Sequence, residues 1–173
     1  MYAKLVNNLD ILGFTDVEPY LSKYLSKDLF SLRFMEQKEN ILFNGTPGVG
    51  KTYLLSAFGR AACMKGMTVR CYRIPRLLTS LGIIRGDGSY DKLMTDMVKP
   101  DLLVLDDFGL KQLDLSMTQD FLEVVEERHH AERSIAISAQ LPVKEWPSVF
   151  KDQTVADAIL DRLVRNAYRF DLK

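Results

Sequence analysis

The sequence has few cysteines, no long hydrophobic run and no net excess of charge. Its 173 residues include two cysteines, Cys63 and Cys71, which lack the spacing of a zinc or redox pair. No apolar run approaches the roughly 18 residues of a membrane-spanning helix, and the N-terminus lacks the apolar stretch of a signal peptide. These absences predict neither a membrane segment nor secretion, so the expected location is the cytoplasm.

The charges are unevenly distributed, although the 23 basic and 23 acidic residues cancel. Acidic residues are absent between residues 40 and 86, whereas they outnumber basic residues between 87 and 127. The basic residues of the first stretch are Lys51, Arg60, Lys65, Arg70, Arg73, Arg76 and Arg85. Such a distribution can place a basic face on a neutral protein, and basic faces attract phosphate backbones. The alternative is a solvated surface on which opposite charges meet after folding.

Short apolar runs alternate with longer amphipathic stretches, which predicts an α/β protein with a parallel sheet. Residues 1–38 are predicted to form an N-terminal helical segment, because apolar residues recur there three and four apart. The remainder, 39–173, is the predicted core domain. Its strand-length runs are 41–43, 68–74, 101–106, 134–138 and 168–172. The predicted helices are 52–64, 75–84, 90–98, 117–129 and 154–165.

A glycine-rich loop lies between the first predicted strand and the helix after it. The phosphate-binding pattern G-x-x-x-x-G-K-[ST] is matched by Gly45, Thr46, Pro47, Gly48, Val49, Gly50, Lys51 and Thr52. Glycines let several backbone N–H groups point to one centre, and the helix that follows adds its own unpaired N–H groups. Lys51 would reach the β- and γ-phosphates, and the Thr52 hydroxyl would ligate Mg²⁺. The strand before the loop and the helix after it disfavour an incidental glycine turn.

Two carboxylates end the most apolar strand. Asp106 and Asp107 follow the run "LLVL", and ligands of open α/β sheets bind at the carboxyl ends of the strands. Asp106 would hold the Mg²⁺ or its water, and Asp107 would orient or deprotonate an attacking water. In isolation the pair also fits acids that end a strand and begin a turn. The nearby phosphate loop favours the catalytic interpretation.

Two further side chains can complete a hydrolytic site. Gln140 follows the strand "SIAIS" and would face the γ-phosphate or its attacking water, or else is a loop residue before Pro142. Arg162 and Arg165 share a face of the last predicted helix. Arginine stabilises charge on a transferring phosphoryl group and can be supplied by a neighbouring subunit. A solvated basic face is the alternative for these arginines.

Four segments resemble, in order and spacing, the IstB-type AAA+ ATPases. These are the transposition helper proteins of bacterial insertion sequences, related to the DnaC and DnaI helicase loaders. The segments are "ENILFNGTPGVGKTYLLSAFGRAACMKG", "PDLLVLDDFGLKQLD", "SAQLPVKEW" and "ADAILDRLVRNAYRFDLK". The resemblance covers residues 39–173 and implies a three-layer P-loop AAA+ core of the ASCE group, with a central parallel sheet and ATP bound between subunits.

The resemblance also implies roles for single residues. Lys51 and Thr52 match the Walker A positions, and Asp106 and Asp107 match the Walker B pair. Gln140 falls at the sensor 1 position, and Arg162 matches the arginine finger donated in trans. Candidates for contact with DNA phosphates, by their place among the DNA-facing helices of related initiators, are Arg73, Arg76 and Arg85.

Two departures from the family pattern bear on activity. Asp107 stands where many AAA+ proteins have glutamate, which predicts slow or geometry-dependent activation of water. The family's C-terminal lid should begin just after "FDLK", where this chain ends, so the lid is expected to be missing.

Three functions remain open at the level of the sequence. The leading hypothesis is an ATP-hydrolysing homo-oligomer with head-to-tail interfaces, which assembles on duplex DNA and assists a transposase. The second is a helicase loader that binds a replicative helicase and uses nucleotide as a switch, with a preference for single-stranded DNA. The third is a small-molecule kinase, in which Arg73 and Arg76 would bind the acceptor.

Overall fold

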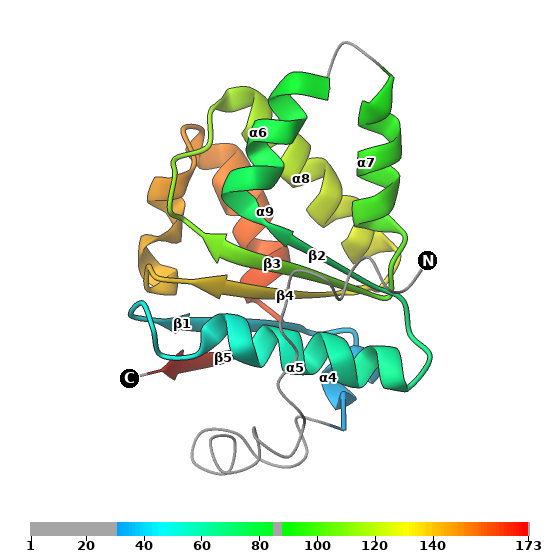
Figure 1. Ribbon diagram of the computed structural model, residues 1–173. Coiled ribbons are helices and arrows are strands. Elements are labelled where there is room, and N and C mark those ends of the chain that lie inside the picture. The colour runs from blue at the N-terminus through cyan, green and yellow to red at the C-terminus, as the bar shows by residue number, and fades with distance from the viewer. Residues whose placement is uncertain (1–30, 85–87, 173) are drawn as a thin grey trace.

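The computed structural model describes residues 31–84 and 88–172, and its centre is a sheet of five parallel strands (Figure 1). Their order across the sheet is β2-β3-β4-β1-β5. The strands are β1 (Asn40–Gly45), β2 (Val69–Arg73), β3 (Leu102–Phe108), β4 (Ser134–Ala139) and β5 (Ala167–Leu172). Because all pairs are parallel, the loops that follow β1, β3 and β4 leave from one edge of the sheet.

Helices cover both faces of the sheet, which gives three layers (Figure 1). One face carries α4 (Arg33–Glu36) and α5 (Lys51–Met64). The other carries α6 (Ile74–Ile84), α7 (Ser89–Val98), α8 (Leu115–His130) and α9 (Gln153–Val164). In β3, Val104 packs in the α5 core and Leu105 in the opposite core. Successive strand side chains alternate between faces, so a strand covered on both faces is apolar throughout, as "LLVL" predicts.

The predicted elements of the core all occur, and their ends lie within two residues of the prediction. The sequence does not predict η1 (Val143–Val149), because a 3₁₀ segment of seven residues containing Pro147 has no helical periodicity. The predicted N-terminal helical segment falls outside the described residues except for 31–38, which include α4. Within 31–84 and 88–172, no helix is long and apolar enough to cross a membrane.

Arg128 of α8 is fully buried and joins three elements at the amino-terminal edge of the sheet. Its guanidinium donates hydrogen bonds to the backbone carbonyls of Met97, Val98, Pro100, Asp101 and Ser134. These carbonyls belong to the end of α7, the connection to β3 and the start of β4. The planar fork of donors in arginine suits such a convergence of acceptors.

Arg128→Ala should lower the free energy of unfolding by at least about 3 kcal/mol, because buried carbonyls lose their donors. Arg133→Ala is the control, since Arg133 donates one hydrogen bond, to the carbonyl of Val98 at 2.9 Å, and its loss should cost about 1 kcal/mol. Urea denaturation followed by circular dichroism measures both values. Equal losses would show that the buried guanidinium does not hold these elements together.

Candidate nucleotide-binding site

The phosphate loop connects the end of β1 to the start of α5. Gly45 has no room for a side chain, because an added Cβ would lie 2.5 Å from the carbonyl oxygen of Leu172 in β5. Gly50 precedes α5 with a φ of 93°, a conformation that glycine adopts without steric cost. Between them, Thr46, Pro47 and Gly48 are exposed, and Val49 packs against the α5 core. The loop thus turns into a helix N-terminus, where unpaired N–H groups favour an anion.

Lys51 is the first residue of α5 and is held against the loop. Its Nζ donates hydrogen bonds to the carbonyls of Gly45, at 2.7 Å, and Thr46, at 2.9 Å. Burial lowers the pKa of Lys51 from its ordinary value, while the charges of Asp106 and Asp107 act in the opposite direction. An ammonium has three donors, so Lys51 can keep the loop in shape and also bind a phosphate oxygen.

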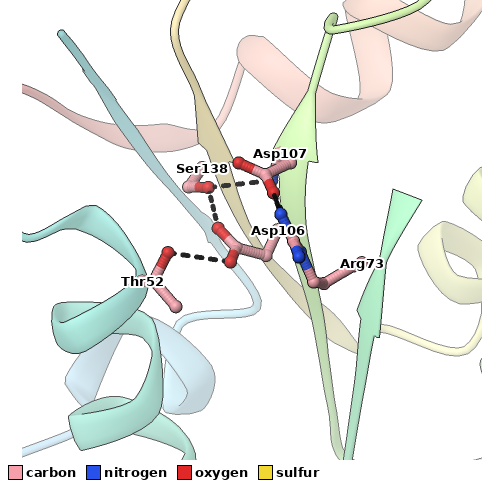
Figure 2. Close-up of polar contacts among 5 residues, drawn as sticks. All are labelled: Thr52, Arg73, Asp106, Asp107 and Ser138. Atoms are coloured by element: carbon pink, nitrogen blue, oxygen red, sulfur yellow. Dashed lines mark hydrogen bonds and ion pairs between the residues drawn. The ribbon is translucent and has the colours of Figure 1, made fainter. Parts of the chain in front are cut away.

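Asp106 links α5 to two neighbouring strands. Figure 2 shows its carboxylate between Thr52 and Ser138. The Thr52 hydroxyl donates to Asp106 Oδ2 at 2.8 Å, and the Ser138 hydroxyl donates to Oδ1. Mg²⁺ prefers oxygen ligands and usually retains several waters beside one or two carboxylates and substrate phosphates. The hydroxyl of Thr52 and the carboxylate of Asp106 fit that requirement, and Mg²⁺ binding by this pair stays a prediction.

Asp107 has a left-handed backbone and a basic partner. Its φ is 63°, which is uncommon for a residue with a side chain but most accessible to Asp and Asn. Arg73, the last residue of β2, donates to Asp107 Oδ2 from Nε at 2.9 Å and also from Nη2 (Figure 2). This hydrogen bond and the charge of Asp107 raise the pKa of Arg73. A predicted contact for DNA phosphate therefore lies against the predicted catalytic carboxylate.

Three further predicted residues, Gln140, Arg76 and Arg85, belong to different segments of the chain. Gln140 directly follows β4 and is half-buried, so it lies at the same sheet edge as the two aspartates. Arg76 is exposed in the first turn of α6. Arg85 is outside the described residues.

Arg162 lies at the opposite edge of the sheet. It lines a cavity of about 560 Å³ together with Asn40, which begins β1, and Asn166, which precedes β5. Its guanidinium forms an ion pair with Glu126 at 2.8 Å and donates to the carbonyl of Ala158 at 2.8 Å. The six residues of β1 separate this edge from the phosphate loop by roughly 17 Å. Arg162 therefore does not meet the phosphate loop of its own chain.

Two residues outside the predicted set, Ser138 and Asn40, support the site. Ser138 contacts Asp106, and its Oγ also accepts a hydrogen bond from the Asp107 N–H at 3.1 Å. Asn40 donates to the carbonyls of Arg162, at 3.1 Å, and Leu163, at 3.2 Å, which fixes the end of α9 to β1. The sequence does carry a signal for both residues: each is a polar residue inside or directly beside a short apolar run that is predicted to form a strand.

The fold and the position of the loop define a class of protein. A parallel sheet in this order, with the phosphate loop after β1 and acidic residues at the end of β3, is the fold of P-loop AAA+ proteins. The structure of DnaI matches with a TM-score of 0.76 and 18% identity, over 97% of this chain and 90% of that one. The DnaC helicase loader matches with a TM-score of 0.68 and 21% identity, over 85% of this chain and 89% of that one. At these identities the likeness concerns the fold.

Sequence similarity defines the family. The model of the IstB-like ATP binding proteins matches residues 3–173, and the chain belongs to this family. A protein of Sinorhizobium fredii is 41% identical over 152 residues, which are 88% of this chain and 62% of the relative. A protein of Geobacillus stearothermophilus is 31% identical over 173 residues, 99% of this chain and 66% of the relative. The names of both relatives describe ATP-binding proteins of insertion sequences.

The left-handed backbone of Asp107 predicts an order of stability between two variants. Asp107→Gly should be about 1 kcal/mol more stable than Asp107→Ala, because both lose the carboxylate but only glycine adopts a positive φ without steric cost. Urea midpoints measured side by side test the difference. Equal midpoints would show that the carboxylate, and not the fold around it, keeps this residue left-handed.

Proposed function

We propose that this protein hydrolyses ATP, assembles head to tail on duplex DNA and assists a transposase in DNA transposition. The observation that carries the hydrolytic part is the convergence of the phosphate loop, Asp106 and Asp107 at one edge of the sheet (Figure 2). The family and the insertion-sequence names of the relatives support the role in transposition. Action on DNA would place the protein in the cytoplasm.

In the proposed reaction, each residue of the site has a separate role. Backbone N–H groups of the loop and Lys51 would bind the phosphates, and Thr52 and Asp106 would hold Mg²⁺. When bound, Mg²⁺ would offset negative charge on the β- and γ-phosphates. The Asp107 carboxylate would accept a proton from the attacking water while the oxygen of that water forms a bond to the γ-phosphorus. The bond from that phosphorus to the bridging oxygen would break, releasing ADP and inorganic phosphate.

Hydrolysis by an isolated chain should be slow, for two reasons. The Asp107 carboxylate is one methylene shorter than glutamate, and it is already hydrogen-bonded to Arg73. Water therefore has to compete with a guanidinium for the oxygen that would accept its proton. The arginine finger is also absent from this edge, because Arg162 lies at the other end of the sheet.

The position of Arg162 supports donation between subunits. A second copy that presents its amino-terminal sheet edge to the phosphate loop would bring its own Arg162 towards the γ-phosphate. Such an interface uses different surfaces on the two partners, and repeating it makes rings or helical filaments. The Glu126 carboxylate and the Ala158 carbonyl hold the guanidinium in one orientation before the subunits meet.

Basic residues near the sheet edge support a DNA partner. Arg76 is exposed on α6, and the side chain of Arg73 is 57% exposed although it is paired with Asp107. Together with Arg85 they are the candidates for contact with DNA phosphates. A helicase loader that uses nucleotide as a switch is the second candidate function, because the DnaC helicase loader and DnaI have the same fold as this chain.

Two inactive variants should restore activity to each other when they are mixed. Lys51→Ala should lose ATP binding but retain a normal Arg162. Arg162→Ala should bind ATP but turn it over roughly 1,000-fold more slowly, as expected for loss of an arginine finger. In a head-to-tail mixture, some interfaces combine an intact loop with an intact Arg162. Phosphate release, measured against protein concentration, should exceed the sum of the two separate rates.

Arg165→Ala is the control for this experiment. Arg165 lies three residues beyond Arg162, is exposed, and has an ion-pair distance of 3.6 Å to Asp161. It should retain near-normal turnover. Normal turnover by Arg162→Ala, or a mixture no more active than its components, would exclude the role in trans.

Duplex DNA should stimulate ATP hydrolysis more than single-stranded DNA. Arg76→Ala should weaken duplex binding equally for different DNA sequences. It should also reduce the slope of the logarithm of the binding constant against the logarithm of the salt concentration by about 1, the value for one phosphate contact. Fluorescence anisotropy of a labelled duplex at several salt concentrations measures both effects, with Arg165→Ala as the control. Stronger stimulation by single-stranded DNA, together with capture of a replicative helicase, would overturn the transposition proposal in favour of the loader.

A further inference from the structure

The register between β3 and β4 shifts at one place, and that place holds the two aspartates. Leu105 pairs with Ile137, whereas the next pair is Phe108 with Ala139. Asp106 and Asp107 together therefore stand opposite the single residue Ser138. This is the arrangement of a β-bulge, in which the extra residue loses its regular partner and its side chain takes a new direction. The φ of 63° at Asp107 belongs to this irregularity.

Ser138 fills the gap that the bulge leaves in the ladder. Its Oγ accepts a hydrogen bond from the Asp107 N–H at 3.1 Å and donates one to Asp106 Oδ1. A hydroxyl has one donor and two acceptor positions, so both hydrogen bonds can exist together. Ser138 is fully buried, which excludes water as a ready substitute for either bond.

These two hydrogen bonds act on different parts of the site. The bond to Oδ1 fixes the Asp106 carboxylate so that Oδ2 faces the Thr52 hydroxyl. The bond from the Asp107 N–H holds the backbone from which the Asp107 carboxylate projects. We propose that Ser138 is a positioning residue, which sets the metal-binding carboxylate and the water-activating carboxylate at the same time. This inference rests on the proposed ATP hydrolysis.

Ser134 provides a matched control on the same strand. Both serines are buried in β4 and lie four residues apart, hence on the same face. The Ser134 hydroxyl has no hydrogen-bond partner among the described residues. Ser138→Ala and Ser134→Ala therefore remove the same atom from similar surroundings, and only the first removes the contacts with Asp106 and Asp107.

The test compares Ser138→Ala, Ser134→Ala and Ser138→Thr. In Ser138→Ala, kcat should fall by about 10- to 100-fold, the usual effect of losing a residue that orients a metal ligand, and half-maximal activity should need more Mg²⁺. ATP affinity without Mg²⁺ should stay unchanged, because the phosphate loop is intact. Ser138→Thr retains the hydroxyl and should recover most of the loss. Melting curves check that all three variants fold.

Separate outcomes test Ser138 and the proposed function. Equal activity and equal Mg²⁺ dependence in Ser138→Ala and Ser134→Ala would overturn the role of Ser138. If the unchanged protein binds ATP but does not hydrolyse it, the hydrolytic function fails. In that case the role of Ser138 is tested by the gain in ATP affinity that Mg²⁺ causes. A fluorescent ATP analogue measures this gain. A smaller gain in Ser138→Ala than in Ser134→Ala supports the role, and an equal gain excludes it.

Discussion

The hydrogen bond between Thr52 and Asp106 connects the helix of the phosphate loop to the strand of the carboxylates, and the arrangement of the site depends on it. The two residues are 54 positions apart, and their side-chain oxygens lie 2.8 Å from each other. They meet because β4 is inserted between β1 and β3 and α5 packs across both β3 and β4. The strand order thus brings Thr52 of the phosphate loop and the carboxylate of Asp106 together.

The two edges of the sheet carry complementary parts of one proposed reaction centre. The carboxyl edge holds the phosphate loop and both aspartates, and the amino edge holds Arg162. Asn40 connects them, since it begins the strand that ends in the phosphate loop and also binds the last carbonyls of α9. A displacement of β1 would therefore move both the phosphate loop and the end of α9 that carries Arg162. This gives a physical reason for a half-buried, hydrogen-bonded asparagine at the start of an apolar strand.

Folding brings the basic and acidic stretches of the sequence together. Arg73 pairs with Asp107, and Arg70 lies 3.9 Å from Asp96. For these two arginines, opposite charges meet after folding, whereas Arg76 remains exposed. Only the pair of Arg73 with Asp107 affects the candidate site, because Arg70 and Asp96 both lie outside it. The Arg73 side chain contacts Asp107 and is also 57% exposed, so a phosphate group that approached it from solvent would compete with the Asp107 carboxylate for the same guanidinium.

The sequence by itself determined the α/β class, the positions of the core strands and helices, the phosphate loop and the carboxylates after "LLVL". Each of these depends on local chemistry: glycine freedom, helix and strand periodicity, and the position where an apolar run ends. Tertiary structure decided the partners. The bulge opposite Ser138, the pairing of Arg73 with Asp107 and the distance of Arg162 from its own loop arise from strand order and register. Strand order and register are set by contacts between residues far apart in the chain, and no local sequence pattern predicts such contacts.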